Sequence, residues 1–356
     1  MMQGMKIAPS LIPWQRQHGR HGMPWQATRD PYRVWLSEIM LQQTQVTTVL
    51  RYYAKFLEKY PDVAALARAS SQEVMSLWAG LGYYARGRNL HACAQKVMTD
   101  WHGQFPDNAA DLVTLPGIGP STAAAIASFC FSERVSILDG NVKRVFARYF
   151  AIEGDTNQRQ VQSRLWDKAN AEIPSQAYLT KDPQAMTAYT QGLMDLGATI
   201  CTRSKPHCDL CPLRAGCAAY AQGLTEELPT PKARRTLPEK STCMLIVYSE
   251  GKLLLERRPE TGIWGGLWSL PEIEGNQQDK LKEHSHTHGY RITQHLTMAS
   301  IQHTFTHFKL HITPILIRAE QSRSDWTPIS SMGNFGLPTP VKKILAGLID
   351  QAVITS

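Results

Sequence analysis

Four of the chain's seven cysteines lie close together, with the spacing C-x6-C-x2-C-x5-C, at Cys201, Cys208, Cys211 and Cys217. Structural zinc sites usually pair their ligands as two C-x2-C knuckles, and only one such knuckle is present here. The wide flanking gaps favour a cubic 4Fe–4S cluster, in which each thiolate takes a different iron. Zinc and four unliganded buried thiols remain the alternatives. The other cysteines are expected to be small core residues: Cys93, Cys130 and Cys243.

A glycine-rich segment, LPGIGPSTA at residues 115–123, has the composition of a tight hairpin that leads into a helix. Gly117 and Gly119 allow positive φ and a close approach of the backbone to a partner. Pro120 is well suited to the first position of the next helix, whose free N–H groups would face an anion such as a DNA phosphate. An ordinary connection between two helices is the alternative.

Two carboxylates are candidates for acid–base and electrostatic chemistry. Glu38 lies between Leu36 and Ile39 on the apolar face of an expected helix. Apolar surroundings raise a carboxyl pKa above its usual value of about 4.3, as an acid that works near neutral pH requires. Asp139 precedes Gly140 where another helix is expected to begin. A buried structural glutamate and a plain helix N-cap are the alternative interpretations.

Residues 30–222 read as mostly helical, and apolar residues recur at helical spacing from Leu36 to Leu57. Residues 226–240 (EELPTPKARRTLPEK) have three prolines, many charges and no periodicity, which is typical of a linker. Beyond it, TCMLIVYSEGKLLLERRP predicts a strand hairpin. A last helix is predicted to have Thr339 as N-cap and Pro340 at its first position, with Val341, Ile344, Leu345 and Leu348 facing inward. The outline is a helical domain (1–225), a linker (226–240) and a smaller α/β domain (241–356).

Length and composition agree with this outline. The chain has 356 residues, so two domains are expected. Its longest apolar run is far shorter than the roughly 20 residues that a membrane span needs. The first residues lack the apolar core of a signal peptide, so a cytoplasmic protein is expected. Reducing conditions there favour metal binding over disulfides. The formal net charge of +8 suits an anionic partner such as nucleic acid.

Long motifs connect these features to a known family. The order of hairpin, ILDGNV and cysteine motif resembles the endonuclease III superfamily of base-excision glycosylases. Within it, VWLSEIMLQQTQV, GLGYYARGRNL, ILDGNVKR and LMDLGATICTRSKPHC are similar to the MutY family of adenine DNA glycosylases. The resemblance covers nearly the whole chain. It implies an all-α helix-hairpin-helix glycosylase domain with an iron–sulfur loop, followed by a Nudix-like α/β domain.

The resemblance assigns roles to the two carboxylates. Glu38 would protonate N7 of adenine and assist the attacking water, and Asp139 would stabilise the cation that develops at C1′ of the sugar. Superfamily members that also cut the strand carry a lysine at the hairpin exit, where this chain has Ser121. A hydroxyl cannot form an imine, so little or no lyase activity is expected.

The same resemblance implies further contacts. Trp25, Asn141 and Gln191 would line the adenine pocket, and Gln42 and Tyr83 would fill the space of the extruded base. Surface polar and core aromatic roles are the alternatives. The remaining candidates for DNA binding are Gln43, Gly117, Gly119, Arg86, Arg88, Lys143, Arg144 and Lys205.

The second domain resembles a Nudix fold that has lost its metal site. Gly266 and Glu272 match the G-x5-E start of the Nudix box, but the later glutamates are missing and Glu283 is out of register. Phe305-Thr306-His307 is expected on a loop between two strands, and it resembles the Phe-Ser-His segment with which the family reads 8-oxoguanine. The alternating histidines of HSHTH (284–288) are interpreted as solvated loop residues rather than metal ligands.

The expected protein is therefore a monofunctional, monomeric glycosylase that acts on duplex DNA and removes adenine opposite 8-oxoguanine or guanine. A glycosylase/lyase, a noncatalytic lesion-binding protein and a Nudix hydrolase with a DNA-binding arm are the rivals. Ser121, the two carboxylates and the missing Nudix glutamates, respectively, argue against them.

Overall fold

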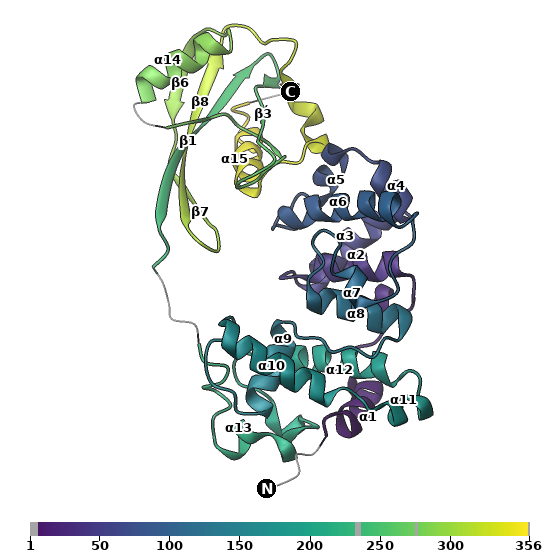
Figure 1. Cartoon of the computed structure of the whole chain (residues 1–356). Helices are drawn as coiled ribbons and strands as arrows, with labels where there is room; N and C mark the ends of the chain where they lie inside the picture. The colour runs from purple at the N-terminus through teal and green to yellow at the C-terminus, as the bar shows by residue number, and fades with distance from the viewer. Residues whose placement is uncertain (1–5, 232–235, 275–276, 355–356) are drawn as a thin grey trace. The chain divides into compact units, whose positions relative to one another are not determined.

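The computed structural model describes residues 6–231, 236–274 and 277–354, and the chain divides into two compact units (Figure 1). The first unit comprises residues 1–68 and 89–233, and the second comprises residues 69–88 and 234–356. The predicted linker overlaps residues 232–235, which lie outside the described residues. The predicted boundaries at 225 and 241 remain predictions. Within the described part of the chain, no helix has the length and apolar composition needed to cross a bilayer.

The first unit is helical, as predicted. Its helices are α1 (Ala8–His18), α2 (Pro31–Leu41), α3 (Val46–Lys59), α4 (Val63–Arg68), α6 (Ala85–Asp100, whose first residues belong to the second unit), α7 (Ala109–Leu112), α8 (Pro120–Phe131), α9 (Gly140–Tyr149), α10 (Arg159–Glu172), α11 (Gln176–Lys181), α12 (Ala185–Thr199) and α13 (Ala218–Ala221). Short 3-10 turns lie at Pro24–Gln26 (η1), Cys208–Leu210 (η2) and Arg214–Gly216 (η3). One core joins α1, α8, α9, α10 and α12 through residues such as Leu11, Ala125, Phe146, Leu165 and Leu193.

The periodic segment from Leu36 to Leu57 is not one helix. It breaks between α2 and α3 at residues 42–45, where Gln43 adopts a left-handed φ of 57°. Apolar residues on both sides keep a helical spacing because each helix buries one apolar face, so the pattern conceals the break. The break turns polar side chains of the LQQT segment toward the site described below.

The second unit is an α/β fold. Its strands are β1 (Glu239–Ser249), β2 (Lys252–Leu253), β3 (Glu256–Arg257), β4 (Trp268–Ser269), β5 (Glu272–Ile273), β6 (Ile292–Thr297), β7 (Ile301–Thr304), β8 (Lys309–Ala319) and β9 (Thr327–Pro328). Its helices are α5 (Ser71–Trp78), α14 (Gln277–Thr287) and α15 (Thr339–Asp350), with a 3-10 segment η4 at Ile329–Asn334.

The long parallel pair of β1 and β8 forms the centre of the main sheet, whose order is β6-β8-β1-β2-β9 (Figure 1). The predicted hairpin is confirmed, because β1 turns into β2 with Tyr248 opposite Leu253. Alternate residues of β1 face opposite layers. Met244 and Ile246 pack with α15, whereas Leu245 and Val247 pack with Leu281 of α14. The sheet therefore lies between two helical layers.

Three expectations need adjustment. The last helix begins at Thr339 itself and its N-cap is Pro338, although the predicted inward residues are buried: Val341, Ile344, Leu345 and Leu348. HSHTH lies at the end of helix α14 and not in a loop, because His284 and Tyr290 pack inward. Cys93 and Cys130 are buried as predicted, whereas Cys243 is only half-buried.

Candidate active site and cysteine site

A cavity of about 1080 Å³ opens in the first unit. Segments far apart in sequence line it, from α2, the hairpin exit, the start of α9 and α12. Nine of the residues singled out from the sequence line this one cavity: Trp25, Glu38, Gln42, Gln43, Ser121, Asp139, Asn141, Arg144 and Gln191.

Glu38 lies in the last part of α2, between the buried residues Ser37 and Ile39. Its side chain is half-buried and lines the cavity. Burial, with a smaller contribution from the nearby charge of Asp139, raises the pKa of Glu38 from 4.5 to about 8. The carboxyl group is therefore mostly protonated at neutral pH, which is the state a general acid needs.

Asp139 is the N-cap of α9, as predicted. Its carboxylate accepts a hydrogen bond from Val142 N at 2.7 Å. Burial raises the pKa of Asp139, while backbone hydrogen bonds and the charges of Arg144 and Lys143 act in the opposite direction. The helix N-terminus favours the anionic form at this position. Burial thus raises the pKa of both carboxyl groups, but only at Asp139 do backbone hydrogen bonds and two cationic side chains oppose the rise.

Ser121 lies in the first turn of α8, directly after the hairpin. Its hydroxyl accepts a hydrogen bond from Leu138 N at 3.1 Å, one residue before Asp139. Ser121 therefore connects the hairpin to the segment that places the carboxylate, and it provides no amine.

Gln191 is held by a pair of residues that sequence reasoning missed. Its Nε2 donates to Asp195 Oδ1 at 2.9 Å, and Asp195 also accepts from Arg20 Nε at 2.8 Å and from Arg20 N at 3.0 Å. Asp195 is fully buried. Because a carboxylate only accepts, it fixes the orientation of the amide and leaves the Gln191 carbonyl to act as an acceptor. The four-residue spacing of Gln191 and Asp195 on α12 was the sequence feature that could have indicated this contact.

Arg144 is not a solvated charge. Its guanidinium donates to Asn141 Oδ1 at 2.9 Å, to Gly197 O at 2.6 Å and to Cys201 O at 2.7 Å. The same side chain therefore supports a cavity residue and the first cysteine of the cysteine motif. Because these hydrogen bonds occupy the Arg144 guanidinium, they compete with the phosphate contact expected for this side chain.

Trp25 and the two glutamines form another part of the lining. Trp25 is buried and meets the ring of Tyr53 edge-on, with centroids 5.3 Å apart. Gln42 Nε2 lies 3.4 Å from Thr122 Oγ1 in the turn that begins α8. Because Gln43 adopts a left-handed backbone conformation, the side chains of Gln42 and Gln43 both lie at the break between α2 and α3.

The hairpin glycines differ from one another. Gly117 has a φ of 77°, and a Cβ there would meet Asn89 at 2.8 Å. Gly119 has a φ of −86°, so it does not use the positive φ that glycine allows. A Cβ at Gly119 would meet nothing within 4 Å, which leaves open space for a close partner. Gly119 is the N-cap of α8 and Pro120 occupies its first position, as predicted.

The basic candidates lie in unlike surroundings. Lys205 is exposed, with a φ of 50°, in the cysteine loop, whereas Lys143 is half-buried. Arg86 and Arg88 belong to the second unit together with Tyr83. Arg88 donates to Gly265 O at 2.8 Å. Burial lowers the pKa of Arg86 to about 10, and its guanidinium lies 5.4 Å from the half-exposed ring of Tyr83.

The four cysteines line one small cavity of about 30 Å³. Burial raises the pKa of Cys211 to about 12, so without a cation its thiol stays protonated. The buried Arg148 donates to Cys201 Sγ at 3.3 Å and to Thr202 O at 2.6 Å, and it supplies positive charge beside the sulfurs. Four convergent thiols with a buried guanidinium fit an anionic metal–thiolate centre.

The predicted reading segment forms a hairpin loop between β7 and β8, as expected. Phe305 stacks on Phe308, with ring centroids 4.6 Å apart, and Phe305 N donates to Phe308 O at 2.9 Å. Thr306 and His307 are exposed at the tip, where Thr306 Oγ1 lies 3.3 Å from His307 Nδ1. The stacked rings of Phe305 and Phe308 therefore support the loop tip, where the polar side chains of Thr306 and His307 are exposed.

Both remaining Nudix-type carboxylates have cationic partners. Glu272 forms an ion pair with Arg258, and Glu283 forms one with Lys280 at 2.6 Å. Neither belongs to a cluster of metal ligands among the described residues.

Comparisons with known proteins agree with this geometry. Residues 36–171 match the HhH-GPD superfamily of base excision DNA repair proteins, and residues 242–347 match the NUDIX domain. The chain has the fold of solved glycosylases. It aligns with a thermostable thymine-DNA glycosylase at 28% identity and a TM-score of 0.53, over 60% of this chain and 95% of that one. It also aligns with endonuclease III in a trapped DNA complex at 18% identity and a TM-score of 0.51, over 63% of this chain and 100% of that one.

Fold and site thus define a helix-hairpin-helix base excision glycosylase with an added NUDIX domain. An adenine DNA glycosylase of Buchnera aphidicola (from Acyrthosiphon pisum) is 36% identical over 94% of this chain and 95% of its own length. The human adenine DNA glycosylase is 33% identical over 85% of this chain and 65% of its own length. The chain belongs to the adenine DNA glycosylase family.

Proposed function

We propose that this enzyme excises adenine paired with 8-oxoguanine, or with guanine, by hydrolysing the N-glycosidic bond as the first step of base excision repair. The observation that carries the proposal is the shared cavity of Glu38 and Asp139, in which the pKa of Glu38 is raised to about 8. Measuring base release from duplexes that differ only in the base opposite adenine tests it.

In the proposed reaction, the protonated Glu38 donates to adenine N7. The C1′–N9 bond then breaks, and its electron pair goes to the protonated base. Asp139 faces the positive charge that develops on the sugar, where a fixed carboxylate stabilises the transition state. Glu38, now ionised, accepts a proton from the water that attacks C1′, and this step restores the acid.

Recognition of the extruded base is assigned to Gln191 and Trp25. With its amide nitrogen held by Asp195, Gln191 offers a carbonyl to the exocyclic amine of adenine. Trp25 provides an apolar wall, and Asn141, held by Arg144, faces the attacking water. The partner is duplex DNA bound by a monomer. Gln42 and Tyr83 fill the space that the extruded base leaves, and the remaining DNA contacts come from the residues expected from the sequence: Gln43, Gly117, Gly119, Arg86, Arg88, Lys143 and Lys205.

We expect the product strand to stay intact, because the Ser121 hydroxyl cannot form an imine with the opened sugar. After complete base release, breaks should appear only with alkali or heat, as measured on a denaturing gel. Ser121→Lys is the matched variant, because it places an amine at the same position and should yield a borohydride-trappable adduct. Prompt cleavage by the wild type, with no contaminating lyase present, would contradict the expectation.

The cysteine site is assigned a 4Fe–4S cluster held by Cys201, Cys208, Cys211 and Cys217. Bound there, the cluster would crosslink the loop that carries Lys205. A crosslinked loop loses less conformational entropy when it docks on DNA than a free one does. The guanidinium of Arg148 offsets the negative charge of the thiolates.

Anaerobically purified protein should be brown and contain about four irons per chain, as measured by elemental analysis. Lys205→Glu should weaken binding to all duplexes alike and reduce the slope of log K against log salt by about one or more. Zinc without iron in anaerobic protein would refute the cluster. A changed ranking of duplexes in the Lys205 variant would refute a phosphate contact.

The hairpin tip at Thr306 and His307 is assigned to the base opposite adenine. 8-Oxoguanine differs from guanine by an 8-oxo group and an N7–H, which a donor and an acceptor at fixed positions can distinguish. Because Glu272 and Glu283 are engaged in ion pairs, the NUDIX domain is proposed to bind without hydrolysis.

A further inference from the structure

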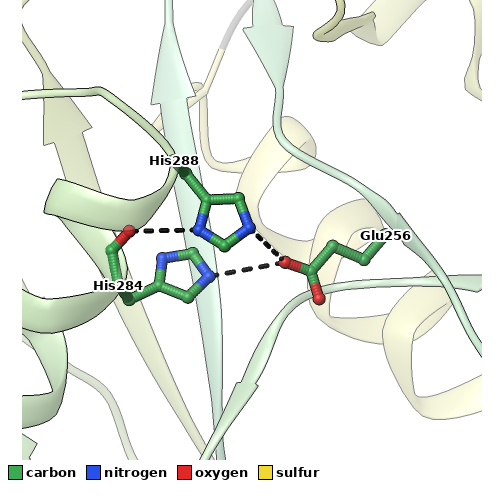
Figure 2. A group of neighbouring side chains, drawn as sticks. All are labelled: Glu256, His284 and His288. Carbon is green, nitrogen blue, oxygen red and sulfur yellow. Dashed lines mark hydrogen bonds and ion pairs between the residues drawn. The ribbon is translucent and has the colours of Figure 1, made fainter.

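Three metal-binding side chains converge in the second unit, away from the cysteine site. His284 and His288 lie one turn apart at the end of α14, and Glu256 lies on β3 (Figure 2). Glu256 Oε1 is 3.0 Å from His288 Nε2 and 3.5 Å from His284 Nε2. One ligand atom from each of the three residues lies within 4.8 Å of the other two. The two Nε2 atoms and the carboxylate oxygen are therefore close enough to share one cation.

Hydrogen bonds on the far side of each ring orient the two histidines. His288 Nδ1 lies 3.1 Å from His284 O, and a carbonyl only accepts, so Nδ1 carries a proton. His284 Nδ1 lies 2.9 Å from the hydroxyl of the buried Tyr290. Metal-binding histidines are usually held in this way by their second nitrogen, which leaves the Nε2 lone pair for the ion.

The arrangement is poorly satisfied by protein atoms alone. His284 Nε2 is buried and makes no hydrogen bond among the described residues. The two imidazoles are stacked, with centroids 4.0 Å apart and planes 19° apart. Neutral rings with protonated Nδ1 atoms would point two lone pairs at a carboxylate oxygen, which is repulsive. A cation among the three atoms turns this repulsion into coordination.

The spacing fits a small tetrahedral ion. Bonds of about 2.0–2.1 Å at tetrahedral angles place neighbouring ligand atoms about 3.3 Å apart. The two separations from Glu256 Oε1, 3.0 and 3.5 Å, lie on either side of that value. Two imidazoles and one carboxylate suit zinc, whereas magnesium and calcium prefer oxygen ligands. We propose that Glu256, His284 and His288 form a zinc(II) site, with water in the fourth position, that fastens the end of α14 to β3.

This site differs from the metal site that a Nudix hydrolase would use. The Nudix-type carboxylates of this chain, Glu272 and Glu283, are paired with Arg258 and Lys280 and take no part in it. Little in the sequence pointed to the site. HSHTH alternates as it would in a loop, but on a helix residues three or four apart share a face, and His284 and His288 are four apart. Glu256 precedes the two histidines in the chain and joins them only through the fold.

Full-length protein with its iron retained is treated with a mild chelator and titrated with zinc chloride by calorimetry. The wild type should bind one zinc per chain. Losing a residue that only hydrogen-bonds to a metal ligand weakens a metal site by about 10–100-fold, so losing a ligand itself in His284→Ala, His288→Ala or Glu256→Gln should weaken zinc binding by more than about 100-fold. His286→Ala is the matched control, because this exposed histidine lies on the same helix outside the group and its loss should change nothing.

Two further measurements keep the proposal open to refutation if a variant folds poorly. Zinc should raise the melting temperature of the wild type and of His286→Ala by several degrees, and should leave that of Glu256→Gln unchanged. X-ray absorption at the zinc edge should show only nitrogen and oxygen neighbours, at about 2.0–2.2 Å. The proposal is overturned if the wild type binds no zinc, if the His286 variant loses zinc as the others do, or if the edge shows sulfur at about 2.3 Å, which would place the ion at the cysteines.

Discussion

Replacing Glu38 with glutamine should slow single-turnover adenine release by about 10²–10⁴-fold, the usual contribution of a positioned acid–base group. Glutamine keeps the shape of the side chain but can neither donate the acidic proton nor accept it back from water. Mispair binding should persist, because the substitution leaves the cavity wall in place. The measurement is the rate of abasic-site formation at saturating enzyme, beside the dissociation constant for the same duplex.

The pH dependence provides the control. With the pKa of Glu38 raised to about 8, wild-type release should fall as pH rises through about 8, and the residual activity of the variant should lack this limb. The expected change in the free energy of unfolding shows that the variant would not lose activity by unfolding. Because the folded pKa exceeds the unfolded value of 4.5, the fold holds a proton that the unfolded chain has released, and the free energy of unfolding falls as pH rises between 4.5 and about 8. Glutamine removes that loss, so an inactive variant should be at least as stable as the wild type at pH 8.

Asp139→Asn belongs to the same test. Loss of its charge should slow single-turnover adenine release by about 10²–10³-fold, as for other groups that face a developing charge. Asparagine can still cap α9 through its side-chain oxygen, so the start of the helix should persist. Substantial single-turnover activity in both the Glu38 and the Asp139 variants would reject the assignment of the two carboxylates.

Changing the hairpin tip should reduce discrimination between 8-oxoguanine and guanine. Thr306→Val keeps the branched shape and removes the hydroxyl. Loss of one group that hydrogen-bonds to a base typically lowers discrimination by roughly 5- to 150-fold. The measurement is the ratio of single-turnover efficiencies on A·8-oxoG and A·G at subsaturating enzyme. Thr304→Val is the matched control, because this exposed threonine lies on the same hairpin beside the tip.

Deletion of residues 241–356 is expected to leave A·G activity and lower the preference for A·8-oxoG, but the fold makes point variants the cleaner test. Met75 of α5 is buried with the core of the second unit, and Ser76 Oγ donates to Asn334 O at 2.9 Å. The deletion would uncover these contacts. An unchanged ratio in the Thr306→Ala/His307→Ala double variant would show that other residues read the opposite base.

Local signals in the sequence predicted much of the site. The N-cap at Asp139, the proline start of α8 and the reading loop all depend on neighbouring residues, and all three appear in the structure. Features that depend on distant partners were not predictable. Arg20 orients Gln191 only because Asp195 is buried between them, and Arg148 reaches Cys201 from another helix. Periodicity likewise concealed the break at Gln43, since the helices on both sides each bury an apolar face.

The most direct test of the central claim compares three duplexes that carry adenine opposite 8-oxoguanine, guanine or thymine. Each is incubated with the wild type under single-turnover conditions and analysed with and without alkali. We predict abasic product from A·8-oxoG first, from A·G more slowly and from A·T not at all, with strand breaks only after alkali. Equal release from A·T, or breaks without alkali, would contradict it.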